Sequence, residues 1–258
     1  TLTHSLKKIM FDKSISLAED YHAASRNGAG YKFIKNGHLV HYEDDVVALK
    51  SVDYIDCTST AKKIKLERPT DLDDVLFLDV LFGRKSSRNF DSKLVSFSNL
   101  SDLLYYGNGY QDIDKGTKFV PSSGGLNSVE LFVIAFSIEQ VPKGIYHYNA
   151  KKHELESVHQ GAFEIWAKEH IFYQEEYARA SFVVVFASAV GKLGKKYGLR
   201  SYRLSLLDVG HVSQNMYLLA SALKLKACAS AGFIDDELDQ ALNIDGFHVS
   251  SFLTMMIG

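Results

Sequence analysis

One short segment combines the residue types best suited to holding an anion. Residues 83–90 read GRKSSRNF, and three cations and two hydroxyl groups fall within five of these positions. Cationic side chains beside hydroxyls can bind a phosphate through charge-assisted hydrogen bonds. The RKSSR segment (residues 84–88) therefore predicts an anion site, and a solvated basic loop is the alternative interpretation.

A second segment is rich in glycine and serine. Residues 120–127 read VPSSGGLN and lead into a run of β-branched and aromatic residues. Glycines let backbone amides approach a ligand closely. The PSSGGL loop (residues 121–126) is thus a candidate binding loop, and a plain turn is the alternative.

Several well-known motifs are incomplete in this sequence. GNG at residues 107–109 lacks the third glycine of a dinucleotide fingerprint, and GKK at 194–196 lacks the first glycine and final hydroxyl of a Walker motif. No GxSxG marks a hydrolase. The ten histidines form no HExxH or paired ligand spacing, so we predict no metal site. We expect His147 and His153 to be structural and His211 to be a core histidine.

The composition limits the class of protein. The chain has 258 residues and a formal net charge of -2, which gives no reason to expect a nucleic acid or an anionic membrane as partner. No transmembrane-length apolar run or signal peptide is visible. The two cysteines, Cys57 and Cys228, lie far apart, which favours a reducing compartment and a cytoplasmic location. Because the first residue is Thr1, we expect a trimmed N-terminus or a piece of a longer chain.

A long helix, expected over residues 202–223, is the element that must organise these segments. Leucines and polar residues recur along it at steps of three or four, but the other faces are apolar too. Such a helix is buried in a large core or in a subunit interface. Its polar residues, among them Arg203 and Asp208, must find hydrogen-bond partners there.

Helices and strands follow one another without strict alternation, which favours an α+β fold. We expect further helices at 14–27, 72–82, 96–106, 165–178 and 235–243, and strands at 129–136, 144–148, 153–155, 181–187, 227–233 (with a turn) and 249–257. Pro69 and the acidic residues after it mark a boundary, with Thr70 or Asp71 as the helix N-cap. Residues 1–70 would form an N-terminal arm or small subdomain, and residues 71–258 the main domain.

Four motifs in this order resemble the nitroreductase-like flavoprotein superfamily. They are RKSSRNF, PSSGGLNSVELFV, GIYHYN followed by HEL, and the stretch from YGLRSYRLSLLDVGH to ASAGF. More narrowly, the chain is similar to SagB/McbC-type dehydrogenases, which oxidise thiazolines and oxazolines of ribosomal peptides to thiazoles and oxazoles. The resemblance covers roughly residues 75–258, and the order of the four motifs is more specific than any one of them.

The resemblance implies an α+β nitroreductase-like fold, with a mixed or antiparallel sheet flanked by helices, and a homodimer that binds FMN at its interface. The flavin phosphate, ribityl chain and pyrimidine edge would contact Arg84, Lys85, Ser86 and Arg88. The loop that reaches the flavin, across the interface, would be Pro121, Ser122, Ser123, Gly124, Gly125 and Leu126. The turn facing the flavin ring would be Ser230, Ala231 and Gly232. The chain ends at Gly258 without the family's C-terminal extension, so we expect Arg84, Arg88 and Arg203 to carry more of the phosphate binding.

The resemblance also implies a catalytic pair, Lys196 and Tyr197. An azoline becomes aromatic by losing a proton from one ring carbon and a hydride from its neighbour, so the protein must supply a base while FMN accepts the hydride. A lysine in a desolvated pocket has a lowered pKa and can serve, with the tyrosine positioning the ring or relaying the proton. The alternative is a solvent-facing lysine in a basic loop, like Lys192 and Lys195.

Three functions are compatible with these features. The first is an FMN-dependent azoline dehydrogenase that acts on a peptide or carrier-bound substrate, with O2 reoxidising the flavin and a cyclodehydratase as a possible complex partner. The second is a general NAD(P)H-dependent nitro- or quinone reductase, which the Lys-Tyr pair disfavours. The third is a flavin-poor scaffold subunit of a peptide-modifying complex, which the cationic segment disfavours. Substrate specificity is expected in surfaces, in residues 1–70 or in a partner.

Overall fold

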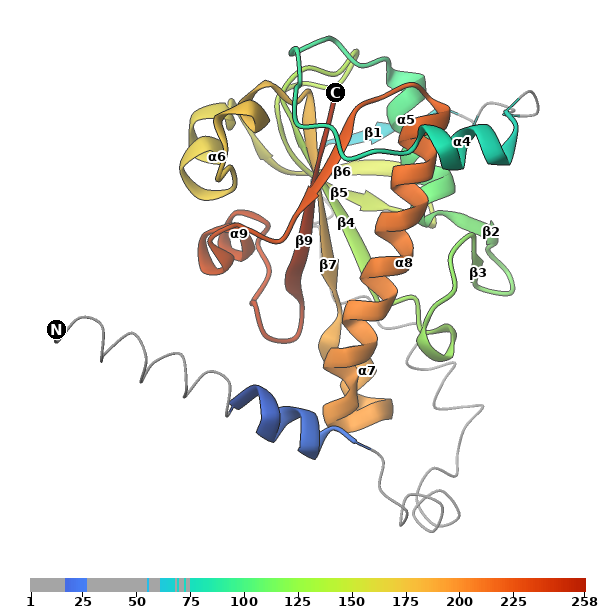
Figure 1. Cartoon of the computed structure of the whole chain (residues 1–258), viewed down its shortest axis with the longest axis vertical. Helices are drawn as coiled ribbons and strands as arrows, with labels where there is room; N and C mark the ends of the chain where they lie inside the picture. The colour runs from blue at the N-terminus through green and yellow to red at the C-terminus, as the bar shows by residue number, and fades with distance from the viewer. Residues whose placement is uncertain (1–16, 27–54, 56–60, 68, 70–71, 73–74) are drawn as a thin grey trace, which may run out of the picture.

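The fold is built on one antiparallel sheet (Figure 1). The computed structural model describes residues 17–26, 55, 61–67, 69, 72 and 75–258. The seven strands lie in the order β1-β6-β5-β4-β7-β9-β8. Their bounds are β1 Lys63–Lys65, β4 Val129–Ala135, β5 Gly144–Asn149, β6 Glu154–Gln160, β7 Phe182–Ser188, β8 Ala227–Ser230 and β9 Ser250–Ile257. All neighbouring pairs are antiparallel, which confirms the predicted α+β fold with an antiparallel sheet.

The central strands are buried on both faces, as the continuous apolar run of residues 181–187 predicted. All seven residues of β7 are buried. In β4, Leu131 and Val133 point into one core, whereas Phe132 and Ile134 point into the other. This alternation divides the interior into two hydrophobic layers, one on each side of the sheet.

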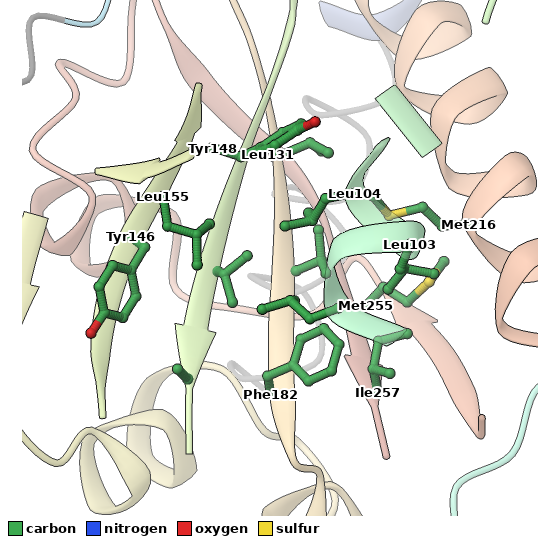
Figure 2. Close-up of a cluster of buried hydrophobic side chains, with 14 of the residues drawn as sticks. Leu103, Leu104, Leu131, Tyr146, Tyr148, Leu155, Phe182, Met216, Met255 and Ile257 are labelled. Atoms are coloured by element: carbon green, nitrogen blue, oxygen red, sulfur yellow. The ribbon is translucent and has the colours of Figure 1, made fainter. Parts of the chain in front are cut away.

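The first layer lies between the sheet and two helices, α5 (Phe97–Asn108) and α8 (Ser201–Ala222). Figure 2 shows this cluster, in which Leu103 and Leu104 of α5 and Met216 of α8 meet side chains of the strands. Helix α5 begins where predicted, because the Ser96 side chain accepts a hydrogen bond from the amide of Asn99 at 3.1 Å.

The second layer is covered by α6 (Glu164–His170), the 3-10 helix η2 (Glu175–Arg179) and α9 (Asp235–Ala241). The prediction of one helix over residues 165–178 is wrong, because the helical path breaks after α6. The break allows Phe172 to pack edge-on against Phe136, at 6.3 Å between ring centroids, and to contact Tyr177. Aromatic burial therefore overrides the helix propensity of this stretch.

Helix α4 (Phe77–Gly83) starts later than predicted. Leu72, Val75 and Leu76 are not helical, while Thr70 and Asp71 lie outside the described residues. The helix forms where it meets the C-terminal end of α8, whose Ser221 hydroxyl donates to the carbonyl of Val80 at 3.0 Å. None of its residues is buried in this single chain, although most are apolar.

Helix α8 buries one face only. Val209, Val212 and Met216 are buried, whereas Leu206 and Leu207 on the other side are 49% and 58% exposed. His211 is exposed, so its assignment to the core is wrong. It lies two positions after Val209, and a helix turns through roughly 200° over two residues, which directs His211 away from the core.

Three further parts of the chain are a short hairpin, the helical segment before α8 and an N-terminal helix. A short hairpin, β2 (Tyr110–Asp112) and β3 (Thr117–Lys118), precedes the PSSGGL loop, and helix α7 (Val190–Tyr197) leads through the 3-10 helix η3 (Gly198–Arg200) into α8. A helix at residues 17–24 lies at the N-terminal end of α8. Within the rest of the predicted N-terminal arm, β1 pairs with β6 at the edge of the main sheet. Most of the remaining arm lies outside the described residues, and its separate status stays a prediction.

Candidate functional site

The RKSSR segment lies beside the edge strand of the sheet. Ser86 forms an isolated parallel bridge with Ala227, the first residue of β8, and the Ser87 amide donates to the Ala227 carbonyl at 2.9 Å. The segment therefore continues the sheet by one short, partly paired strand. This pairing holds the RKSSR segment next to the strand that ends at the Ser230–Gly232 turn.

Tyr217 of α8 organises the first half of this segment. Its hydroxyl accepts a hydrogen bond from the Ala229 amide at 2.7 Å and shares a 3.0 Å hydrogen bond with the Ser86 hydroxyl. The Arg84 guanidinium lies over its ring, 5.5 Å from the centroid. This cation–π contact holds Arg84 beside Ser86 while its nitrogen atoms keep their capacity to bind an anion.

Arg88, the second arginine of the segment, is held by Tyr177 of η2. Its Nε donates to the Tyr177 hydroxyl at 3.2 Å, and the Cys228 thiol lies 3.5 Å from that hydroxyl. The hydrogen bond to Tyr177 and the nearby Cys228 raise the pKa of the Arg88 guanidinium above its ordinary value. Arg88 is thus a fixed cation, and it remains exposed to a ligand.

The Ser230–Gly232 turn is also well ordered by its contacts. The Gly232 amide donates to the Ser230 hydroxyl at 3.1 Å, and the Thr254 hydroxyl donates to the Ser230 carbonyl at 2.9 Å. A Cβ atom at Gly232 would lie 2.6 Å from the Tyr173 ring, so a side chain there would displace this tyrosine. The structure therefore brings the predicted phosphate-binding residues and the predicted ring-facing turn to the same edge of the sheet.

An open cavity of about 670 Å³ borders the RKSSR segment, between α4 and the C-terminal end of α8. Its volume lies within the range of small-molecule sites. Basic side chains line it from two sides: Lys85 from the segment, and Lys224 and Lys226 from the connection to β8. The cavity thus combines the size and the positive charge that a phosphate-bearing ligand requires.

The PSSGGL loop carries the second group of predicted residues. Gly124 has φ of 60°, a conformation that favours glycine. A Cβ atom built on it would lie 2.2 Å from the Tyr197 hydroxyl and 2.6 Å from Lys196 Nζ. The loop backbone therefore forms the wall against which both members of the predicted catalytic pair pack.

The pair itself occupies the C-terminal end of α7 rather than a basic loop. Lys196 and Tyr197 are both half-buried, and Lys196 Nζ lies 5.2 Å from the centroid of the Tyr197 ring. Among the neighbouring lysines, Lys195 is exposed but Lys192 is buried, which corrects the expectation that both face solvent.

The PSSGGL loop is anchored by Asp208, a buried residue of α8. Its carboxylate accepts hydrogen bonds from the Ser123 amide at 3.1 Å and from the Ser123 hydroxyl at 2.8 Å. The sequence indicated only that Asp208 needed partners. Its pairing with the loop, like the roles of Tyr217 and Tyr177, was missed, because each joins segments far apart in the chain.

The RKSSR segment and the PSSGGL loop contact α8 at different points along its length. Tyr217 holds the RKSSR segment and Asp208 holds the PSSGGL loop, so their anchor points are separated by roughly 14 Å along the helix axis. Arg203 joins neither group through its described contacts: its Nε donates to the Ser25 hydroxyl at 2.7 Å, beside the helix at residues 17–24. Its role in phosphate binding stays a prediction.

The hairpin histidines have structural partners. His147 Nε2 lies 3.0 Å from a carboxylate oxygen of Glu130, and His153 joins Ser101, Tyr148 and the Glu67 carbonyl. In the part of the chain that the structure describes, no group of three metal-binding side chains occurs. None of the helices described there has the length and apolar character of a membrane span.

Comparison with curated proteins identifies relatives of two kinds. "Putative nitroreductase MJ1384" of Methanocaldococcus jannaschii is 29% identical over 180 residues, which cover 67% of this chain and 87% of that protein. The microcin B17-processing protein McbC of Escherichia coli is 26% identical and the trifolitoxin operon protein TfxC of Rhizobium leguminosarum is 25% identical. The matches span 66% of McbC and 49% of TfxC.

Solved structures share the fold. A nitroreductase-like protein of Anabaena variabilis superposes with a TM-score of 0.70 at 25% identity, over 80% of this chain and 43% of that one. A chain of the Escherichia coli microcin synthetase McbBCD complex, solved with truncated pro-MccB17 bound, superposes with a TM-score of 0.61 at 19% identity, over 96% of this chain and 93% of that one.

The family match supports FMN as the cofactor, and a structure of the same fold from Desulfovibrio desulfuricans was solved in complex with FMN (TM-score 0.50, 18% identity, over 70% of this chain and 84% of that one). The residues of the RKSSR segment fit FMN. Arg84, Ser86 and Arg88 offer two cations and a hydroxyl for the phosphate, and the cavity that borders the same segment is lined by the alternate residues Lys85 and Ser87. Bound FMN would be held by these residues and would accept a hydride.

The model of the nitroreductase family matches residues 81–258, which include both groups of site residues. Since this match covers well over half of the chain, the protein belongs to the nitroreductase family, and its relatives place it with the SagB/McbC-type members.

Proposed function

We propose that the protein is an FMN-dependent dehydrogenase that oxidises thiazoline or oxazoline rings in a peptide to thiazoles or oxazoles. The observation that carries this proposal is the packing of Lys196 and Tyr197 against the backbone of Gly124. A lysine amine and a tyrosine hydroxyl converge on one glycine of a loop that belongs to the cofactor site by resemblance. This arrangement supplies the proton-accepting group that removal of a ring proton from an azoline requires.

In the proposed reaction the azoline ring loses two electrons and two protons, as one hydride and one proton. The FMN isoalloxazine supplies the acceptor for the hydride that leaves one ring carbon. The Lys196 amine takes the proton that leaves the neighbouring carbon, and the C–H electron pair becomes the new ring double bond. The Tyr197 hydroxyl, held near the amine, orients the ring or passes the proton onward.

We infer that the complete site needs two copies of the chain. The RKSSR segment and the PSSGGL loop are anchored roughly 14 Å apart along α8 of one chain. The apolar side chains of α4 and of the outer face of α8 are exposed, including Phe77, Phe82 and Leu207 at 65%, 86% and 58%. A second copy that covers this surface would bring its PSSGGL loop and Lys196–Tyr197 pair to the RKSSR segment of the first.

We propose a ribosomal peptide as the substrate, presented in a modifying complex. The relatives McbC and TfxC bear names that link them to microcin B17 processing and to the trifolitoxin operon. The fold matches a chain of the McbBCD complex over nearly its whole length. A partner that forms the azoline, such as a cyclodehydratase, would supply the substrate. A general nitroreductase remains the second candidate, because the family match covers such enzymes as well.

The test is single turnover of a synthetic peptide that contains one thiazoline, under anaerobic conditions, with the FMN-loaded protein. We expect loss of the visible absorbance of oxidised flavin, a mass decrease of about two hydrogens in the peptide, and a rate lowered about 10²–10⁴-fold in Lys196→Ala with FMN content unchanged. Lys195→Ala, which removes an exposed neighbouring lysine, is the control and should keep the wild-type rate.

Three outcomes would contradict the proposal. Full turnover by Lys196→Ala would remove the lysine from the reaction. Rapid flavin reduction by NAD(P)H, without oxidation of any azoline peptide, would favour the general reductase. A colourless protein that binds no added FMN would instead indicate a scaffold subunit.

A further inference from the structure

Asp208 is a buried acidic residue at the centre of a polar network. It is 2% exposed, in the middle of α8. Its two carboxylate oxygens each lie 3.1 Å from the Ser123 amide nitrogen, and they also accept from the hydroxyls of Ser123 at 2.8 Å and Ser128 at 3.2 Å. A carboxylate held away from water is stable only when hydrogen bonds replace its hydration.

The network continues through two more buried hydroxyls. The Ser188 hydroxyl, at the end of β7, shares hydrogen bonds with the hydroxyls of Ser128 at 3.3 Å and of Ser205 in α8 at 3.1 Å. The three serines are 0% exposed. Asp208 is thereby connected to the beginning of β4, the end of β7 and an earlier turn of its own helix, so its position is fixed by three elements of the core.

The PSSGGL loop connects Asp208 to the Lys196–Tyr197 pair. Ser123 is the residue that Asp208 binds, and the next residue, Gly124, is the one whose missing Cβ leaves room for both the Lys196 amine and the Tyr197 hydroxyl. Movement of the loop by less than an ångström toward or away from α7 would therefore change where both side chains rest.

We propose that Asp208 is a positioning residue for the Lys196–Tyr197 pair. Its carboxylate binds the Ser123 amide and hydroxyl, fixes the PSSGGL loop against α7, and so sets the place of the amine that accepts the proton. Asp208 takes no part in the proton transfer. The inference rests on the proposed function of the pair, but its structural half concerns only the loop and can be measured without turnover.

Asp208→Asn is the informative variant. The amide has nearly the same shape, but it has one acceptor oxygen where the carboxylate has two, and it carries no charge. Bonds to an ionised acceptor are stronger than bonds to a neutral one. Ser123→Ala removes only the hydroxyl bond and keeps the amide bond, so its effect should be smaller and in the same direction.

Asp239→Asn is the matched control. Asp239 is also a buried aspartate, 5% exposed, and it accepts hydrogen bonds from the Ser251 amide at 3.0 Å and the Ser250 hydroxyl at 3.5 Å. It joins α9 to β9, on the side of the sheet away from α8 (Figure 1). A loss of stability alone would affect both aspartate variants, whereas a loss of positioning would affect only Asp208→Asn.

The experiment has two readouts on the FMN-loaded protein. The first is turnover of the thiazoline peptide, for which we expect Asp208→Asn to lower kcat by about 10²-fold with KM little changed, because a displacement near 1 Å can cost that much. The second is the rate at which acetic anhydride modifies Lys196, measured by mass spectrometry relative to Lys195. We expect Asp208→Asn to increase this ratio severalfold and Asp239→Asn to leave both readouts at the wild-type level.

The outcomes separate this inference from the proposed function. An unchanged Lys196 modification ratio in Asp208→Asn overturns the positioning role, whatever the turnover. A changed ratio with wild-type kcat also overturns it, because the loop would then move without consequence. If the wild-type protein oxidises no azoline, the proposed function fails, and the modification ratio still decides whether Asp208 positions the pair.

Discussion

At the scale of single residues, a glycine determines the geometry of the candidate site. Gly124 combines a positive φ with a position where an added Cβ atom would displace the Lys196 and Tyr197 side chains. The two effects can be separated, because Gly116 has a similar φ of 67° but nothing within 4 Å of a Cβ built on it. Only at Gly124 would an added methyl group meet the Tyr197 hydroxyl and the Lys196 amine.

Gly124→Ala should therefore lower the rate of azoline oxidation by about tenfold or more, because it displaces both members of the pair. Gly116→Ala carries a similar conformational cost of about 1 kcal/mol, which should reduce stability without changing the rate. Single-turnover kinetics and thermal unfolding of both variants make the comparison. Equal oxidation rates in the two variants would show that the Lys196–Tyr197 pair does not depend on its packing against Gly124.

At the scale of secondary-structure elements, His153 joins the turn between β5 and β6 to α5. Its Nε2 lies 2.8 Å from the Ser101 hydroxyl of α5 and 2.9 Å from the Glu67 carbonyl, and its Nδ1 lies 2.9 Å from the Tyr148 hydroxyl. Burial lowers the pKa of His153 below its ordinary value. The imidazole is therefore a neutral structural group that connects three segments.

This shift predicts the pH dependence of stability. Below about pH 6.5, residue 153 gains a proton more readily in the unfolded chain than in the folded one, so the free energy of unfolding falls as the pH decreases. At pH 8 we expect His153→Gln to be less stable than the wild type by about 1–2 kcal/mol. The difference between the two proteins should shrink toward pH 5, because only the wild type carries this histidine.

Urea unfolding of both proteins at a series of pH values measures this difference. Groups shared by the two proteins cancel in the comparison. A difference that grows as the pH decreases would mean that the folded state holds a protonated imidazole, which contradicts the arrangement described here.

At the scale of the whole molecule, the exposed apolar surface of α4 and α8 determines the expected assembly. Monomeric proteins seldom expose a large contiguous apolar patch. Both helices lie on the same side of the sheet (Figure 1), beside the cavity that borders the RKSSR segment. Dimer formation and cofactor binding should therefore depend on each other.

Phe82→Glu, which places a charge on a side chain 86% exposed in the single chain, should convert a dimer into a monomer and release FMN at the same time. Ile165→Glu is the control, because Ile165 is 75% exposed but lies on α6, over the opposite face of the sheet. Light scattering after size-exclusion chromatography, combined with flavin absorbance, measures both properties. A wild-type protein that is monomeric and binds FMN would contradict the two-chain site.

Much of this protein could be predicted from local patterns in its sequence. Apolar runs located the central strands, and the capping residue Ser96 located the start of α5, because both signals arise from residues adjacent in the chain. The order of four short motifs indicated the family and FMN, and the family match confirms that assignment. The roles of the RKSSR segment and the PSSGGL loop in binding FMN were inferred in the same way and stay predictions.

The limits of some helices and the burial of some polar residues depend on contacts between distant segments, so only the tertiary structure determined them. Aromatic packing in the second core breaks the helix expected over 165–178, and docking against Ser221 determines where α4 forms. The phase of α8 relative to the sheet exposes His211 and buries Asp208. Polar residues occur on more than one face of α8, and only the packing of the helix shows which of them are buried and must find hydrogen-bond partners. The sequence therefore determined which residues could form the site, whereas the packing of α7 and α8 decided that Asp208, Gly124 and Lys196 form one connected unit.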